Sequence, residues 1–194
     1  MIEPEPIACA IFLMTAFVVA GFAQSFWLRS DWSKRFQHPI DGGVSFRGKR
    51  IFGDNKTWRG FIAIVPSVSL AFVAVRLPYL LSDDLSGRLW PLSLFGYALL
   101  GLVAGTGFMI GELPNSFMKR QLDIPPGAAP QAVGTRWICF IIDRLDSILS
   151  GMLFLAVCVP VPILTWCLIL LVGPFVHLAF NWLLYRLGVK ARPA

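Results

Sequence analysis

Charged residues are scarce in this chain, and so are cysteine and histidine. Of its 194 residues only 14% are charged, whereas 56% are hydrophobic and 13% aromatic. This composition argues against a water-soluble globule, in which about a quarter of residues are charged, and against a disordered chain, which has few aromatics. The four cysteines lie in apolar runs without CxxC spacing, so we expect neither a disulfide framework nor a zinc site. The two histidines, His38 and His177, are assigned no role.

Five apolar runs are long enough to cross a bilayer, which takes about 20 mainly apolar residues. They cover residues 7–28, 58–81, 89–111, 137–159 and 162–185. The fourth run contains charges up to Asp146, but a helix that began after Asp146 would have only about 13 residues before Pro160, too few to span. Gly101 and Gly105 in the third run form a small-xxx-small pair, which predicts close helix packing. We predict an all-α integral membrane protein, a five-helix bundle that forms a single domain over residues 1–194.

Basic residues are concentrated in alternate connections between these runs. Residues 29–59 hold eight Lys or Arg, and residues 119–136 hold three. The tail after Tyr185 holds Arg186, Lys190 and Arg192, whereas residues 82–88 hold one. The positive-inside rule therefore places the two sizeable loops and the C-terminus in the cytoplasm, and the N-terminus outside. In so apolar a chain, we expect the net charge of +6 to orient helices in the inner (cytoplasmic) membrane and not to bind nucleic acid.

The acidic pair Asp143 and Asp146 is the most informative feature of the fourth run. Three residues apart, the two carboxylates share one helical face near the cytoplasmic boundary of the membrane. Two anions side by side in a partly dehydrated site repel each other unless they are protonated, paired with cations or bound to a metal. Oxygen ligands beside phosphate chemistry suit Mg²⁺, whereas ion pairs to Arg144 or Lys119 are the structural alternative.

Two further segments carry side chains suited to phosphate groups. We expect residues 111–120 to form a loop that leaves the membrane on the same side as Asp143. This segment offers a third carboxylate together with amide, hydroxyl and cationic donors, from Glu112, Asn115, Ser116, Lys119 and Arg120. Residues 47–60 combine basic residues with glycines just before the second run, and backbone N–H groups in such a turn bind anions.

Three sequence blocks together resemble the CDP-archaeol synthase family, which is related to the bacterial phosphatidate cytidylyltransferases. The blocks are FGDNKTWRG at residues 52–60, GELPNSFMKR at 111–120 and DRLD at 143–146, in the family's order. The resemblance implies an integral membrane enzyme with five transmembrane helices. Such an enzyme transfers CMP from CTP to a lipid phosphate with Mg²⁺ and releases pyrophosphate, so the implied partners are CTP, the lipid phosphate and the bilayer.

The resemblance also implies roles for individual residues. The implied metal ligands are Asp143 and Asp146. The implied catalytic residues are Glu112, Lys119 and Arg120. The implied substrate-binding residues are Asn55, Lys56, Thr57, Arg59, Asn115 and Ser116. Residues 125–127 and 132–134 differ from the Lys-Asp and His-Gly-Gly elements of the wider cytidylyltransferase signature, so the resemblance implies no role for this loop.

Several alternatives stay open at the level of sequence. The acceptor is an isoprenoid ether lipid phosphate, a diacyl phosphatidic acid or another lipid phosphate, and hydrophobicity does not choose among them. A small transporter with an ionisable path near its cytoplasmic side is the alternative from a different class. A CTP-dependent reaction would indicate the enzyme, whereas flux of a solute across the membrane would indicate the transporter. The related enzymes favour a homodimer.

Overall fold

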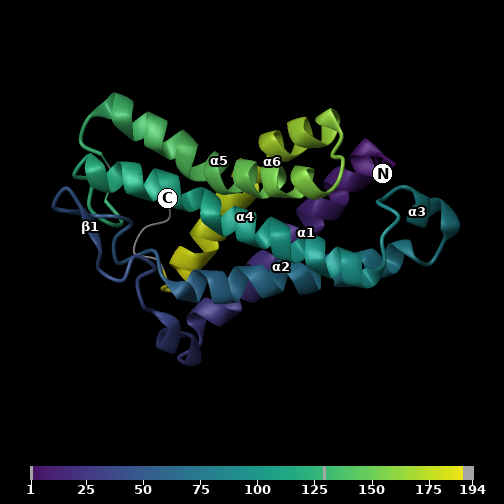
Figure 1. The fold of residues 1–194 in the computed structure, drawn as a ribbon, viewed down its shortest axis with the longest axis horizontal. Helices are drawn as coiled ribbons and strands as arrows, with labels where there is room; N and C mark the ends of the chain where they lie inside the picture. Colours follow the sequence, from purple (N-terminus) through teal and green to yellow (C-terminus); the bar gives the residue numbers. More distant parts are fainter. Residues whose placement is uncertain (1, 129, 190–194) are drawn as a thin grey trace.

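The computed structural model describes residues 2–128 and 130–189, and their regular structure is almost entirely helical (Figure 1). The long helices are α1 (Pro6–Arg29), α2 (Trp58–Tyr79), α4 (Leu94–Gln121), α5 (Val133–Cys158) and α6 (Ile163–Arg186). The short elements are the 3₁₀ helix η1 (Trp32–Phe36), the strands β1 (Ser45–Phe46) and β2 (Lys49–Arg50), and the helix α3 (Asp83–Gly87). The predicted all-α class is confirmed, with one addition: β1 and β2 form a small antiparallel hairpin.

The long helices form a closed ring. Each packs against two others, in the order α1, α2, α4, α5, α6 and back to α1. Two glycines of α4 allow its close contact with α2. A Cβ on Gly101 would lie 2.6 Å from the Cα of Ser69, and one on Gly105 would lie 3.1 Å from the Cα of Val65. The close packing predicted from the small-xxx-small pair is therefore confirmed.

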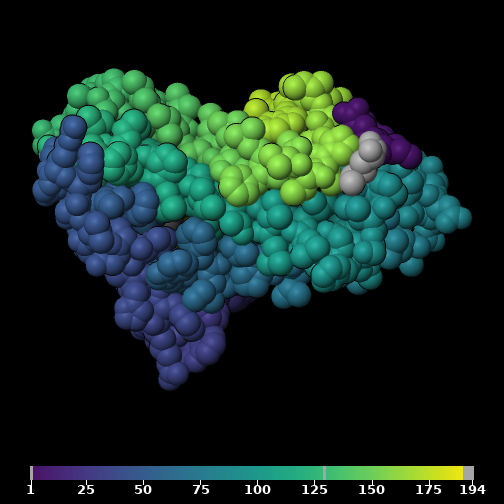
Figure 2. Space-filling view, in the orientation of Figure 1, coloured from purple at the N-terminus to yellow at the C-terminus, as the bar shows by residue number. Residues whose placement is uncertain are grey.

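The connections gather at the two ends of the ring (Figure 1). At one end the first loop, residues 30–57, meets the end of α4, where the Lys49 ammonium donates a 2.8 Å hydrogen bond to the carbonyl of Gln121. In the space-filling view this loop lies against the ends of α4 and α5 (Figure 2). At the other end, the indole of Trp90 donates a 2.8 Å hydrogen bond to the carbonyl of Pro160. Successive connections thus alternate between the ends, and the assignment of the first-loop end to the cytoplasm stays a prediction.

An aromatic cluster fills the end of the ring away from the first loop. The ring of Phe12 on α1 makes edge contacts with Phe72 at 5.1 Å, Tyr97 at 5.5 Å and Trp90 at 6.2 Å between centroids. All four side chains are fully buried, and the Tyr97 hydroxyl donates a hydrogen bond to the Trp90 carbonyl. Edge-to-face aromatic pairs pack closely, so side chains fill the interior of the ring at this end.

Within the described residues, α1, α2, α4 and α6 are long and apolar enough to cross a membrane. Helix α5 is of similar length, with 26 residues, but charged side chains lie between its start and its middle. These charges are Arg136, Asp143, Arg144 and Asp146. The protein is therefore an integral membrane protein whose described part contains four such helices, and a fifth crossing by α5 stays a prediction. The basic residues Lys190 and Arg192, used to predict orientation, lie outside the described residues.

One predicted boundary is wrong in a way that affects the site. The third apolar run was expected over residues 89–111, followed by a loop. Instead α4 begins at Leu94 and continues to Gln121, with Pro114 inside it. The continuation carries Asn115 and Ser116, which are buried because they face α5 and the first loop, and these contacts stabilise the helix beyond its apolar part. The other long helices begin and end within a few residues of the predicted bounds, and the largest difference is the start of α5 at Val133.

Candidate functional site

A cavity of about 810 Å³ lies inside the ring near the first loop. Its wall includes residues of all the long helices and of the first loop, and apolar side chains from the helix interiors, such as Leu13, Leu155 and Ile169, form its inner part. Every site residue predicted from sequence lines it. These are Asn55, Lys56, Thr57, Arg59, Glu112, Asn115, Ser116, Lys119, Arg120, Asp143 and Asp146. The fold therefore brings three sequence-distant blocks to one place.

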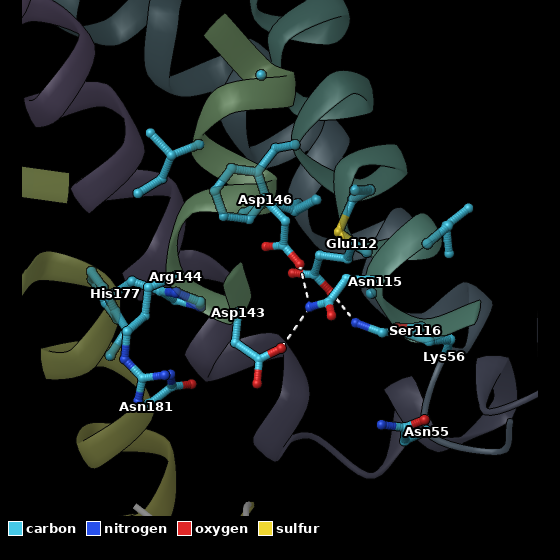
Figure 3. Close-up of a pocket in the computed structure, with 18 of the residues that line it drawn as sticks. Asn55, Lys56, Glu112, Asn115, Ser116, Asp143, Arg144, Asp146, His177 and Asn181 are labelled. Atoms are coloured by element: carbon cyan, nitrogen blue, oxygen red, sulfur yellow. Dashed lines mark hydrogen bonds and ion pairs between the residues drawn. The ribbon is translucent and has the colours of Figure 1, made fainter. Parts of the chain in front are cut away.

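The acidic pair lies at the centre of the polar wall (Figure 3). The amide nitrogen of Asn115 donates to both carboxylates, at 2.6 Å from Asp143 Oδ1 and 2.8 Å from Asp146 Oδ2. One atom thus contacts both acids, which confirms that they share one face of α5. The Lys119 ammonium forms an ion pair with Asp143, as the structural alternative for the acids anticipated. The Oδ1 of Asn115 is buried and has no hydrogen-bond partner among the described residues.

A third carboxylate, Glu112, is linked to the pair through Ser147. The Ser147 hydroxyl lies 3.1 Å from Glu112 Oε1 and 3.2 Å from Asp146 Oδ1. The Ser147 backbone N–H donates to the same Asp146 oxygen at 2.7 Å. On the other side, Glu112 forms an ion pair with Lys56 from the end of the first loop. The site is therefore a connected network across α4, α5 and the first loop.

Arg120 is a buried basic side chain on the wall of the cavity. Only 8% of its surface is accessible, and its Nε and Nη1 are buried without a hydrogen-bond partner among the described residues. The first loop covers it closely, because a Cβ on Gly53 would lie 3.4 Å from Arg120 Cδ. Gly53 has φ +87°, a conformation that favours glycine. A buried guanidinium with free donors on a cavity wall is suited to bind an anion.

Arg59 and Thr57, two predicted substrate-binding residues, also have structural contacts. The Arg59 guanidinium donates to Ser33 Oγ at 2.8 Å and to the carbonyl of Leu28. These bonds hold η1 against the start of α2. Thr57 is the N-cap residue of α2, although its side chain makes no capping hydrogen bond.

A buried carboxylate organises the first loop. Asp41 Oδ2 accepts hydrogen bonds from the backbone N–H groups of Phe52 at 2.9 Å and Gly53 at 3.0 Å. Its Oδ1 accepts from the Gly43 N–H at 3.1 Å and from Arg50 at 2.6 Å. Burial raises the pKa of Asp41, but the hydrogen bonds from Arg50 and the three backbone N–H groups outweigh burial and hold that pKa well below its usual range. The N–H groups of the glycine-bearing turn thus bind a carboxylate of the protein itself, and their predicted role toward phosphate groups stays a prediction.

Several residues of the site were missed from sequence. Ser147 follows Asp146 and lies one helical turn after Asp143, so the helical period could have placed it on the acidic face. His177 and Asn181 of α6 line the cavity with Arg144 of α5, and their spacing of four residues is a helical-face signal in an otherwise apolar run. The sequence contains no pattern that marks Asp41 as important. Three of its partners are backbone N–H groups, and their positions depend on how the loop folds.

The described residues contain no group of three or more His, Cys, Asp or Glu side chains placed to hold a metal ion. The carboxylates of Asp143 and Asp146 converge on the amide nitrogen of Asn115, whose own Oδ1 is buried without a hydrogen-bond partner among the described residues. Two carboxylates and an amide oxygen form a donor set that suits Mg²⁺.

Comparison with known proteins gives consistent matches. The family model described as "CarS-like: CDP-archaeol synthase" matches residues 35–193. A CDP-archaeol synthase of Thermococcus onnurineus is 34% identical over 159 residues, which cover 80% of this chain and 82% of that protein. A CDP-archaeol synthase of Halobacterium salinarum is 35% identical over 164 residues, with coverages of 80% and 82%.

A solved structure supports the fold. It is described as an intramembrane enzyme for archaeal membrane lipids biosynthesis, and it superimposes with a TM-score of 0.60 at 24% identity, covering 92% of this chain and 96% of its own. At this identity the match speaks for the fold alone. The family match covers most of the chain, including all three blocks that line the cavity, and the chain therefore belongs to the CDP-archaeol synthase family.

Proposed function

We propose that the protein is a CTP-dependent cytidylyltransferase that converts a membrane lipid phosphate into a CDP-activated lipid and releases pyrophosphate. Family membership supports this class of reaction. The observation that carries it is the joining of Asp143 and Asp146 by Asn115 in the same cavity as the buried guanidinium of Arg120. Carboxylates that converge beside unpaired cationic donors suit a substrate that brings both phosphate groups and a divalent cation.

The cofactor in this proposal is Mg²⁺, held by Asp143 and Asp146. The fit rests on the two carboxylate oxygens within 2.8 Å of one Asn115 nitrogen and on the buried Asn115 Oδ1 that has no partner among the described residues. When bound, Mg²⁺ would neutralise phosphate charge. The Ser147 hydroxyl lies between the carboxylates of Glu112 and Asp146, and Glu112 thereby supports the position of the Asp146 carboxylate.

The reaction joins two phosphates without a demanding proton transfer. An oxygen of the lipid phosphate forms a bond to the α-phosphorus of CTP, and the bond from that phosphorus to the β-phosphate oxygen breaks. Pyrophosphate leaves with the electron pair. Because the attacking oxygen is already anionic at neutral pH, the residues contribute orientation and charge stabilisation. Lys119, Arg120 and Lys56 are the groups we assign to the triphosphate, and Asn55, Thr57, Arg59 and Ser116 to the walls that hold CTP.

The cavity also suits a substrate with two kinds of surface. Its polar wall lies near the first loop, and its apolar wall extends between the helices. A lipid phosphate has the same division between headgroup and chains. The relatives are named CDP-archaeol synthases, so an isoprenoid ether lipid phosphate is the acceptor to test first, before diacyl phosphatidic acid. The proposal places the site at the cytoplasmic face and includes a homodimer, for which molar mass in detergent is the test.

The decisive experiment measures pyrophosphate release by purified protein with CTP, Mg²⁺ and a panel of lipid phosphates. Turnover should require CTP, Mg²⁺ and the phosphate of the lipid, so the matching dialkylglycerol without phosphate is the control. Failure of folded protein to turn over any lipid phosphate would contradict the proposal. In that case, ion flux into vesicles that contain the protein would favour the transporter alternative.

A further inference from the structure

Helix α6 carries two polar side chains where its composition calls for apolar ones. The helix has a mean hydropathy of 2.2 in its most apolar window, yet His177 and Asn181 both line the cavity. Four residues apart, they lie on one face of α6. Polar groups in a membrane helix are costly and usually face a functional site. This face of α6 therefore places two polar side chains on the wall of the cavity.

Arg144 of α5 lies on the same side of the cavity. Only 6% of its surface is accessible. Its guanidinium carbon lies 3.3 Å from the centroid of the Phe140 ring, and its Nη1 donates to the Phe140 carbonyl at 2.7 Å. The Nε of Arg144 is buried without a hydrogen-bond partner among the described residues. A buried cation held in place by its own helix, with a donor to spare, is prepared to contact an anion.

Polar groups with one cation, Arg144, and the cation Lys56 lie on opposite sides of the acidic pair. Figure 3 shows Arg144, His177 and Asn181 on the α6 side of Asp143, and Lys56 on the other side, beyond Glu112. Residues on both sides line the same cavity. The cavity therefore has two places for anionic groups, with the acidic pair between them.

The proposed reaction needs two such places. An in-line displacement at phosphorus requires the attacking and leaving oxygens on opposite sides of the reacting atom. Both substrates are anions, so each needs cationic or hydrogen-bond donors to overcome their mutual repulsion. Donors on one side only would hold the leaving group and leave the incoming phosphate without a partner.

We propose that Arg144, His177 and Asn181 form the subsite for the acceptor, a phosphate monoester of a lipid, while Lys56, Lys119 and Arg120 receive the triphosphate of CTP. This assignment rests on the proposed cytidylyltransferase function. An acceptor phosphate on the α6 side would direct an oxygen toward the α-phosphorus near Asp143, and pyrophosphate would leave on the Lys56 side. The chains of the acceptor would then lie along the apolar wall formed with α6.

The test separates lipid binding from nucleotide binding. Asn181→Leu removes an amide but suits an apolar helix, so it should leave the fold intact, and Arg144→Gln removes the charge. For both variants we expect the KM for a dialkylglycerol phosphate to rise about tenfold or more, because hydrogen bonds to a charged phosphate are lost. The Kd for CTP, measured without lipid, should stay within about twofold, because the proposal assigns no contact with the nucleotide to either side chain. Arg186→Gln is the matched control, since Arg186 stacks on Trp182 at 4.9 Å and is not part of the cavity wall.

The opposite pattern would overturn the subsite. If Asn181→Leu and Arg144→Gln weaken CTP binding and leave the lipid KM unchanged, the α6 side serves the nucleotide. Binding of dialkylglycerol phosphate, compared with the same lipid lacking phosphate, is measured in parallel by thermal shift. If the wild-type protein turns over no lipid phosphate, the proposed function fails. The subsite is then supported by a phosphate-dependent shift in the wild type that Asn181→Leu loses, and overturned by equal shifts in both.

Discussion

Gly111 of α4 lies directly against the backbone of Asp146 on α5. A Cβ on Gly111 would lie 2.6 Å from the carbonyl oxygen of Asp146 and would also overlap the side chain of Ser150. One turn further along α4, Asn115 donates to the carboxylate of the same Asp146. The glycine thus sets the separation of the two helices at the point where their polar groups meet.

Gly111→Ala is therefore expected to reduce both stability and activity. The added methyl must displace α5, and overpacking of this kind costs about 1–3 kcal/mol. Because the acidic pair moves with α5, CMP transfer should fall by about tenfold or more. Thermal unfolding and pyrophosphate release measure the two effects. Gly87→Ala is the control, because nothing lies within 4 Å of a Cβ there. Equal behaviour of both variants would contradict the role of the close contact.

Asp143→Asn and Asp146→Asn are each expected to reduce the rate of pyrophosphate release by about 100-fold or more, because the proposed Mg²⁺ loses an anionic ligand. The amides preserve shape, so the variants should stay folded and inserted in membrane. Asp84→Asn serves as control, since that carboxylate pairs with Arg88 on the surface. Turnover at the wild-type rate in either site variant would remove the metal assignment.

Arg120→Gln is expected to weaken CTP binding. The guanidinium has buried donors without partners among the described residues, so a phosphate that contacts them would lose charge-assisted hydrogen bonds on substitution. We expect the Kd for CTP to rise about tenfold or more and the KM for the lipid to change little. Nucleotide titration in detergent gives the Kd, and Arg88→Gln reports on the loss of a surface cation. An unchanged Kd would assign Arg120 to the structure of the first loop.

Acidification is expected to release the first loop. The pKa of Asp41 is lowered in the folded protein, and an unfolded Asp has a pKa of about 3.9. The contribution of Asp41 to stability is therefore fully present above about pH 4 and is lost as pH falls below that value through the folded pKa. Hydrogen exchange at the Phe52 and Gly53 amides, corrected for the intrinsic effect of pH, should show constant protection from pH 7 to about 5 and a loss below about 4.

A substitution at Asp41 tests at neutral pH whether the carboxylate charge holds the first loop. Asp41→Asn should speed exchange of the Phe52 and Gly53 amides by about tenfold or more, since hydrogen bonds to charged groups contribute about 1.5–3 kcal/mol. Asp31→Asn should have no such effect, because in the described part of the chain the Asp31 carboxylate pairs with Lys34 on the surface of the loop. Slow exchange in Asp41→Asn would mean that the hairpin, and not the carboxylate, holds the turn.

The sequence anticipated the long helices and the shared face of the acidic pair, because both follow from local signals. Hydropathy over about 20 residues identifies a span regardless of its neighbours. The spacing of Asp143 and Asp146 places both on one helical face whatever packs against it. The predicted end of α4 was wrong because it depends on contacts with other parts of the fold. Residues 112–121 are polar and contain Pro114, so their helical form depends on contacts with α5 and the first loop.

By itself, the sequence determined that this is an apolar helical protein with acids, cations and an amide in three separate blocks. Only the tertiary structure decided which of these groups meet. In the folded protein Asn115 donates to both acids, and the N–H groups of the first loop donate to Asp41. His177 and Asn181 lie on the other side of Asp143 from Lys56 (Figure 3). The physical reason is that a helical period fixes directions along one helix, whereas the ring of helices fixes which faces converge on one cavity.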